Sequence, residues 1–218
     1  MNAKEVPMGA ALSYGWETFT QNAFFLVGVF AATAVVDWVL KAATSYHAID
    51  GTYFEFVVNV VGCLVNVVLS MGLIAITLKF KDGANPEFGD LFGQAPKLFH
   101  FVAASILYGL MVVVGLVIFI VPGVYLALRF MFFGYFIVDQ NAGPIEALSR
   151  SSALTTGVKM DLLFMMIMLT GIGIAGLIAL GVGVFVALPV NYLALAFVYR
   201  RLLGTPPLSQ DGVAAVAA

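Results

Sequence analysis

The feature that most constrains this chain is a series of six apolar runs, each long enough for a helix to cross a lipid bilayer. A membrane-spanning helix needs about 20 mostly apolar residues. The runs cover about 22–42, 54–79, 98–120, 122–139, 160–180 and 184–203. Only 10% of the 218 residues are charged, against about 25% in soluble domains, so the chain cannot coat a soluble surface with charge. We therefore expect an all-α, polytopic membrane helix bundle with six transmembrane helices.

Short turns join the apolar runs into three hairpins. Pro122 and Gly123 separate the third run from the fourth, and proline suits the start of a helix because its missing N–H has no partner there. The segment Gly181-Val182-Gly183 separates the fifth run from the sixth in the same way. Either pair of runs, taken as one helix, would be longer than the bilayer is thick. We therefore expect a hairpin turn at each of these places.

The two sides of the predicted bundle differ strongly in positive charge. Lys41 is the only cation in the loops of one side, and the other side has eight. The eight are Lys4, Lys79, Lys81, Lys97, Arg150, Lys159, Arg200 and Arg201. Because cytoplasmic loops carry the excess of lysine and arginine, both termini are expected to be cytoplasmic. The first apolar run lacks the pattern of a cleaved signal peptide, so it is expected to remain as a span.

Three segments on the cytoplasmic side have apolar residues at helical spacing, opposed by polar ones. They lie at about 12–23, 88–98 and 145–158. Each is expected to be an amphipathic helix that lies at the level of the lipid headgroups and leads into a span.

The order of amphipathic helix, span, outer turn and span occurs three times, which predicts an internal repeat at about 8–83, 84–139 and 140–204. The junctions KFKDGANPEFGDLF (79–92) and FIVDQNAGPIEALS (136–149) share an aspartate followed by glycine or asparagine and then proline. Residues 1–204 are thus expected to form a single transmembrane domain, followed by a short disordered cytoplasmic tail at 205–218.

The third surface helix has the clearest start signals. Asp139 ends the preceding span, and Pro144 opens the helix. Glu146 and Arg150 are four residues apart, so they are expected to form an i,i+4 ion pair.

Polar residues within the spans are costly to bury in lipid, and five of them are candidates for a cluster. At about 1.5 Å per residue, Arg129 lies roughly 10 Å from the outer face, and Asp37 falls at a similar depth. Asn59 and Asn191 also fall in the outer half, and Asn66 lies nearer the middle. We therefore expect Arg129 to pair with Asp37, with the asparagines as further partners.

Two roles remain open for this cluster. In the first, Arg129 and Asp37 form a structural clamp, or Arg129 snorkels towards the outer headgroups. In the second, the cluster lines an outward-facing cavity that binds a small anion or a lipid headgroup. The structural role is favoured, and a tightly filled space around Arg129 would argue against a transporter.

Residues suited to catalysis or cofactor binding are scarce. His47 and His100 are the two histidines, expected in an outer loop and at the cytoplasmic start of the third span. One chain therefore offers neither two facing histidines at bilayer depth for haem b nor the three or four ligands of a zinc site. The glycines of the last two spans indicate close helix packing rather than a phosphate loop. Cys63 is the single cysteine and allows no internal disulfide. No catalytic residue, metal or cofactor is therefore expected.

The stretch PGVYLALRFMFFGYFIVDQNAGPIEALSRSSALTTG (122–157) resembles the YciC-like bacterial six-span integral membrane proteins and the related membrane domain of glycerophosphoryl diester phosphodiesterases. The shared pattern is a Pro-Gly turn, a span with an internal arginine and a final acidic residue, and then a surface helix. The matching positions are Pro122, Gly123, Arg129, Asp139, Glu146, Ala147, Leu148, Arg150, Ser151 and Gly157. The resemblance implies a multi-pass protein of the bacterial inner membrane. It does not imply phosphodiesterase activity, because that activity belongs to a soluble domain that this sequence lacks.

These features predict a non-catalytic integral inner-membrane protein that acts as a scaffold or accessory subunit in envelope upkeep or in a larger membrane complex. The alternative is a transporter or lipid-handling protein that uses the polar cluster around Arg129. An intramembrane enzyme would need a titratable pair at depth, for which Asp37 is the only candidate. The expected partners are membrane lipids and, as a further option, other membrane subunits or a second copy of the chain. The net charge of −2 gives no sign of nucleic-acid binding.

Overall fold

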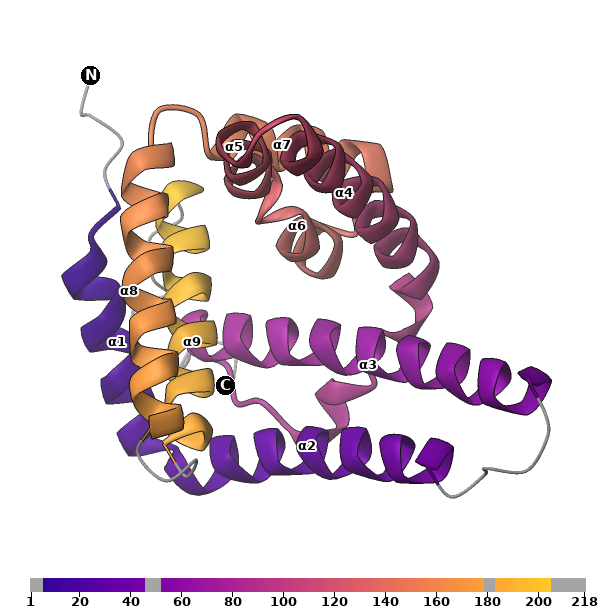
Figure 1. Ribbon diagram of the computed structural model, residues 1–218. Helices are drawn as coiled ribbons and strands as arrows, with labels where there is room; N and C mark the ends of the chain where they lie inside the picture. The colour runs from indigo at the N-terminus through magenta and orange to yellow at the C-terminus, as the bar shows by residue number, and fades with distance from the viewer. Residues whose placement is uncertain (1–5, 46–51, 179–182, 205–218) are drawn as a thin grey trace.

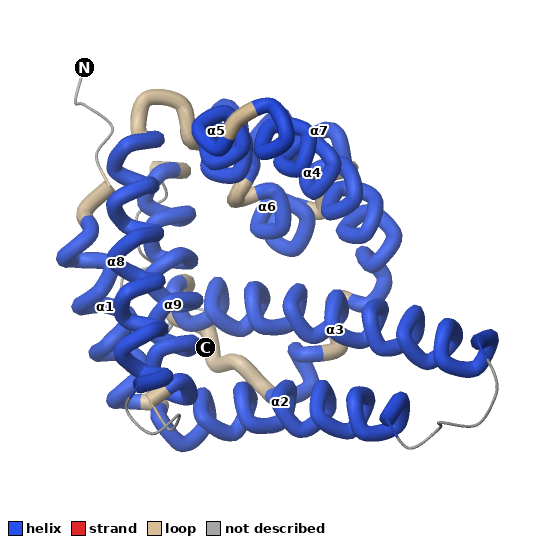
Figure 2. The backbone as a smooth tube through the Cα atoms, in the orientation of Figure 1, coloured by secondary structure: helices blue, strands red, loops and turns tan. Residues whose placement is uncertain are grey.

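The chain folds as an all-α bundle, as predicted, in a computed structural model that describes residues 6–45, 52–178 and 183–204 (Figure 1). The elements are α1 (Met8–Gln21), α2 (Ala23–Ser45), α3 (Thr52–Lys81), η1 (Phe88–Leu91), η2 (Ala95–Lys97), α4 (Leu98–Ile118), α5 (Ile120–Phe130), α6 (Phe133–Gln140), α7 (Pro144–Leu154), α8 (Lys159–Ile178) and α9 (Val184–Leu202). Over these described residues every regular element is helical (Figure 2). The predicted tail at 205–218 and most of the predicted turn at 181–183 lie outside them.

Within the described residues, six helical stretches are long and apolar enough to cross a membrane, which confirms the predicted number of spans. They are Ala23–Ala42, Phe56–Lys81, Phe88–Ile118, Ile120–Gln140, Lys159–Ile178 and Val184–Leu202. The protein is therefore a multi-pass membrane protein.

The fourth span is not one continuous helix, because Met131 and Phe132 separate α5 from α6. At this break, hydroxyl groups of α7 bond to the backbone. The Phe132 N–H donates to Ser151 Oγ at 3.1 Å, and the carbonyl oxygen of Arg129 accepts a hydrogen bond from Thr155 Oγ1 at 3.0 Å. Polar side chains of α7 thus stabilise a break that would be costly in lipid.

The turn between α4 and α5 lies earlier than the predicted position at Pro122 and Gly123. Phe119 has extended backbone angles of φ −166° and ψ 154°, and α5 begins directly after it. Pro122 is accordingly in the first turn of α5, where backbone N–H groups have no helical partner. Gly123 allows the two helices to approach closely, since a Cβ atom there would lie 2.4 Å from Leu116 Cδ2. The glycine therefore acts in helix packing rather than in the turn.

The second predicted amphipathic helix, at 88–98, is wrong in type. The structure has two short 3₁₀ helices there, η1 and η2, and a regular helix starts only at Leu98. Gly93 lies between the two turns, and Pro96 has no N–H to donate to a longer helix. The segment packs tightly on α3, because a Cβ atom at Gly72 would lie 2.3 Å from the carbonyl oxygen of Leu91.

The short segment that opens each predicted repeat packs against a helix that closes another one. η1 packs on α3 and α7 packs on α6, while α1 runs along α9 (Figure 1). The first segment thus packs on the last helix and closes a ring of three units. The helices α3, α6 and α9 are each followed by a residue with positive φ, namely Gly83, Asn141 and Gly204. These contacts and helix ends fall at the boundaries of the three predicted units.

The buried core is centred on aromatic side chains of α6 and α9. Phe132 and Tyr199 are fully buried, and their rings lie 5.9 Å apart. Tyr135 and Phe136 also contact the Tyr199 ring, at 5.1 and 5.3 Å. This packing fixes the end of α9 beside the end of α6.

Candidate functional site

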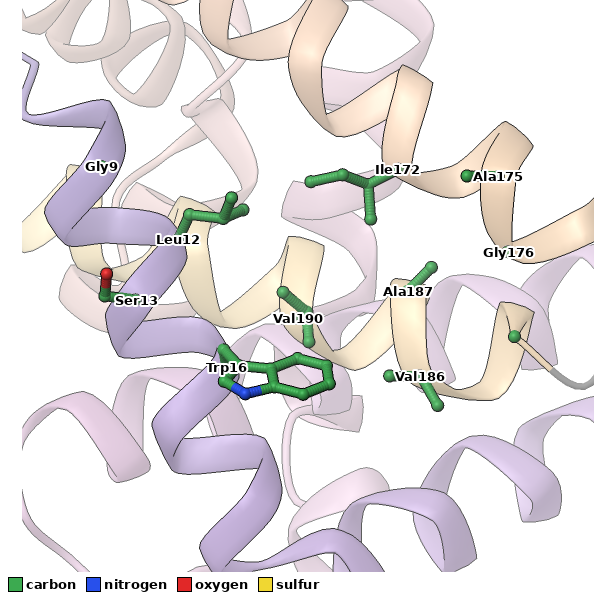
Figure 3. A pocket seen from close by; sticks show the side chains of 11 residues that line it. Gly9, Leu12, Ser13, Trp16, Ile172, Ala175, Gly176, Val186, Ala187 and Val190 are labelled. Atoms are coloured by element: carbon green, nitrogen blue, oxygen red, sulfur yellow. The ribbon is translucent and has the colours of Figure 1, made fainter. Parts of the chain in front are cut away.

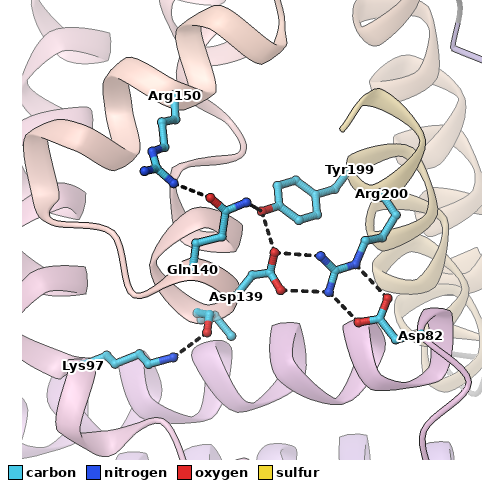
Figure 4. A network of polar contacts seen from close by, with 8 residues as sticks. Asp82, Lys97, Asp139, Gln140, Arg150, Tyr199 and Arg200 are labelled. Atoms are coloured by element: carbon cyan, nitrogen blue, oxygen red, sulfur yellow. Dashed lines mark hydrogen bonds and ion pairs between the residues drawn. The ribbon is translucent and has the colours of Figure 1, made fainter. Parts of the chain in front are cut away.

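The strongest polar cluster joins the ends of three helices around Arg200 (Figure 4). The Arg200 guanidinium donates from Nε to Asp82 Oδ1 at 2.8 Å. It also binds Asp139 in a bidentate manner, from Nη1 to Oδ2 at 2.7 Å and from Nη2 to Oδ1 at 2.8 Å. Arg200, Asp82 and Asp139 are called the Arg200 centre below. A planar guanidinium suits this task because its donors form a fixed fork that matches carboxylate geometry.

Each member of the Arg200 centre comes from the end of the closing helix of a different unit. Asp82 directly follows α3, Asp139 lies in the last turn of α6, and Arg200 lies in the last turn of α9. The side chains are largely withdrawn from solvent, with exposed fractions of 13% for Arg200, 16% for Asp139 and 34% for Asp82. The centre therefore holds the three units together at one point.

A second layer of hydrogen bonds connects the Arg200 centre to α7. The Tyr199 hydroxyl donates to Asp139 Oδ2 at 3.0 Å, and Gln140 Nε2 donates to the Tyr199 oxygen at 3.4 Å. Arg150 in turn donates to Gln140 Oε1. Figure 4 shows this chain of contacts running from α9 through α6 to α7.

The residues predicted to start the third surface helix lie next to this network. α7 begins at Pro144, and the Gly143 N–H donates to Glu146 at 3.4 Å. Glu146 and Arg150 form an i,i+4 ion pair at 2.5 Å. Asp139 has a larger role than the predicted one, because it binds Arg200 rather than only ending a span. The sequence interpretation missed Arg200 and Asp82, although the similar junctions at 79–92 and 136–149 could have indicated that the two aspartates are equivalent.

The predicted pair of Arg129 and Asp37 is wrong. Asp37 binds Lys41 on the same helix at 2.6 Å, whereas Arg129 Nε donates to Ser152 Oγ of α7 at 2.7 Å. Arg129 thus lies beside α7, the helix predicted to lie at the cytoplasmic headgroups, and its predicted depth of roughly 10 Å from the outer face stays a prediction. Counting residues along one span gives the depth of a side chain, but it does not show which helix lies beside that side chain.

The asparagines of the predicted cluster divide between two places. Asn66 lies 3.5 Å from Asp37 through Nδ2, and Asn59 lines the same small cavity of about 250 Å³. Asn191 is elsewhere, and its Nδ2 donates to the Leu169 carbonyl of α8 at 3.1 Å. The structure therefore brings Asp37, Asn59 and Asn66 together without Arg129 or Asn191.

An apolar groove with a volume of about 780 Å³ lies between α1, α8 and α9. α9 forms its floor, α1 contributes Leu12 and Trp16, and α8 contributes Ile172 (Figure 3). Small residues such as Gly176 and Ala187 leave the space open. Such a groove between membrane helices can hold hydrocarbon, but its lining offers little to orient a polar substrate.

Acidic, cysteine and histidine side chains in the described part of the chain do not gather in groups of three that could hold a metal ion. The charged side chains of the Arg200 centre are engaged with one another. The Arg200 centre therefore binds helix ends together.

Comparison with known proteins shows similarity to uncharacterized bacterial proteins. The uncharacterized protein Mb2590 of Mycobacterium bovis is 25% identical over 225 residues, which cover 90% of this chain and 69% of that protein. The uncharacterized proteins MT2637 and Rv2560 of Mycobacterium tuberculosis are 25% and 26% identical, with the same coverage. No family model and no solved structure matches the chain. The similarity thus extends over most of the chain, to proteins whose printed names assign no activity.

Proposed function

We propose that this chain is a non-catalytic integral protein of the bacterial inner membrane, of the YciC-like type, that serves as a scaffold or accessory subunit. Its place would be in envelope upkeep or in a larger membrane complex, with membrane lipids and other membrane subunits or a second copy as partners. The observation that supports this role is the Arg200 centre. Its charges join three helix ends, so these largely buried ionic groups act in architecture.

The orientation that we propose has both termini in the cytoplasm, on the side of the cation-rich loops. A green fluorescent protein fused after Ala218 should then fluoresce in cells, whereas alkaline phosphatase inserted after Lys41 should be active in the periplasm. An active phosphatase fused at the C-terminus would contradict this orientation.

The scaffold role is tested by cross-linking in cells. In a Cys63→Ser background, single cysteines are placed at Phe24, Ile106 and Ile167, which are 96%, 66% and 60% exposed on three different helices. We expect at least one of them to give a discrete cross-linked product with another membrane subunit. A cysteine at the buried Ala196 serves as the matched control and should give none.

The same chain purified and reconstituted in vesicles should move neither lipids nor solutes. A chain that cross-links to no other subunit from any of the three positions, and that transports when it is reconstituted, would contradict the scaffold proposal. It would favour the alternative of a transporter or lipid-handling protein that uses Arg129, which the structure places beside Ser152 of α7.

A further inference from the structure

Arg129 and Lys159 are two neighbouring cations without a carboxylate partner among the described residues. Lys41, Lys79, Arg150 and Arg200 each form an ion pair with an aspartate or glutamate. Lys97 instead donates to the Val138 carbonyl, and Lys81 lies over the rings of Tyr14 and Phe197. Asp161 is close to Lys159 in the sequence, but no ion pair joins it to either cation. Two unneutralised charges beside a membrane are expected to attract an anion.

The two cations lie near each other because Lys159 binds Tyr125, which is one helical turn before Arg129 on α5. Lys159 Nζ donates to the Tyr125 hydroxyl oxygen at 2.8 Å and lies 4.3 Å from the centre of the Tyr125 ring. Arg129 follows Tyr125 by one helical turn on α5, and its Nε donates to Ser152 Oγ at 2.7 Å. Arg129, Lys159, Tyr125 and Ser152 are called the Arg129 site below.

The Arg129 site has more hydrogen-bond donors than acceptors. The terminal nitrogens of Arg129 are not used by its bond to Ser152, which employs Nε alone. The hydroxyl groups of Tyr125 and Ser152 accept from the cations, so each keeps its own hydrogen to donate. Such a set of donors complements a phosphate group, whose oxygens are acceptors.

An exposed apolar tip lies next to the Arg129 site. The five residues of 117–121, at the end of α4 and the start of α5, are each between 66% and 81% exposed. Val121 is separated from Arg129 by about 12 Å of helix, at about 1.5 Å per residue. A molecule with its anionic group at Arg129 could therefore lay acyl chains along the apolar start of α5, an arrangement that free phosphate cannot use.

We propose that the Arg129 site binds the phosphate group of an anionic membrane phospholipid, with its acyl chains along α5. In the orientation proposed above, this lipid belongs to the cytoplasmic leaflet, because α7 and the start of α8 lie on that side. The site is a binding function separate from the Arg200 centre, and it holds whether or not the chain is a scaffold.

Native mass spectrometry of the full purified chain tests the site with phosphatidylglycerol and phosphatidylcholine of identical acyl chains. The wild-type protein should retain more phosphatidylglycerol than phosphatidylcholine. Arg129→Gln and Lys159→Gln should each lower retention of phosphatidylglycerol about fivefold, the effect expected for one basic side chain near a lipid surface. Arg150→Gln removes a more exposed cation of α7, which already forms an ion pair with Glu146, and it should leave retention unchanged.

The variants and a competitor separate the possible outcomes. Equal retention of the two lipids by the wild type, or an equal loss in Arg150→Gln, would overturn the proposal. Displacement of phosphatidylglycerol by excess inorganic phosphate would show a site for free phosphate and would overturn the lipid assignment. If Arg129→Gln does not elute as a folded protein, two other variants decide the question. Lys159→Gln is suitable because Lys159 makes no bond to α7, and Arg129→Lys is suitable because it keeps the charge.

Discussion

Replacement of Arg200 by glutamine should be among the most destabilising single changes in the bundle. Arg200 is 13% exposed and binds two carboxylates, so its loss leaves Asp82 and Asp139 facing each other without a cation. Removing one partner of a buried ion pair costs about 3–5 kcal/mol. For a chain of this size, about 2–4 °C of melting temperature corresponds to each kcal/mol, so we expect a fall of roughly 6–20 °C.

The two aspartates should rank below Arg200 in order of burial. Asp139 is 16% exposed and also accepts from Tyr199, so Asp139→Asn should cost about 3 kcal/mol. Asp82 is 34% exposed, so water can solvate the polar groups that lose their partner in Asp82→Asn. This change should therefore cost about 1–2 kcal/mol. Thermal unfolding of the purified proteins in one detergent, followed by size-exclusion fluorescence, gives the three values on a single scale.

The equivalence of the three units adds a sharper test. The double variant Arg200→Asp/Asp139→Arg keeps two carboxylates and one guanidinium in the centre, with the cation moved to α6. It should recover more than half of the loss shown by Arg200→Asp alone. A loss below 1 kcal/mol in Arg200→Gln, or a double variant less stable than either single variant, would refute the assignment of the centre as the joint of three units.

Two further predictions concern packing and surface charge. Gly72→Ala should lower stability by about 1–3 kcal/mol through a clash with the Leu91 backbone. Gly109 lies in a helix with open space around it, so Gly109→Ala should leave stability unchanged or raise it by up to about 1 kcal/mol. Thermal unfolding of the two variants checks both values. Asp37→Asn should leave the melting temperature almost unchanged, because its pair with Lys41 is exposed, and a combined exchange of Asp37 with Arg129 should give no mutual rescue in the same assay.

The spans could be predicted from the sequence because their signal is local. Hydropathy and length within one window decide whether a helix can cross a bilayer, and these quantities depend on no neighbouring element. The predicted runs at 54–79 and 98–120 accordingly lie within a few residues of α3 and α4. Helix ends, in contrast, respond to packing, which explains why the turn falls at the apolar residue Phe119 instead of at Pro122.

The partners of the polar residues could not be predicted in the same way. Depth along a span is one coordinate, but pairing also depends on which helices are neighbours and on which side of each helix a residue lies. Arg129 and Asp37 had matching predicted depths and still contact different helices. The Arg200 centre would have been easier to predict from the sequence. The predicted internal repeat places Asp82 and Asp139 at equivalent positions, and two such carboxylates need a shared cation.

Arg129 and Arg200, both within spans, are used in opposite ways, and this difference can be measured. Arg200 faces the axis where the three units meet, and its charge is matched by two aspartates. Arg129 is half-buried between α5 and α7, with a serine as its partner and donors left over. Loss of Arg200 should therefore lower the melting temperature and leave the preference for phosphatidylglycerol intact in protein that remains folded. Loss of Arg129 should reduce that preference with a much smaller effect on melting. If both variants lose stability and lipid preference in the same proportion, one structural element underlies both properties, and the separation of an architectural arginine from a lipid-binding one is wrong.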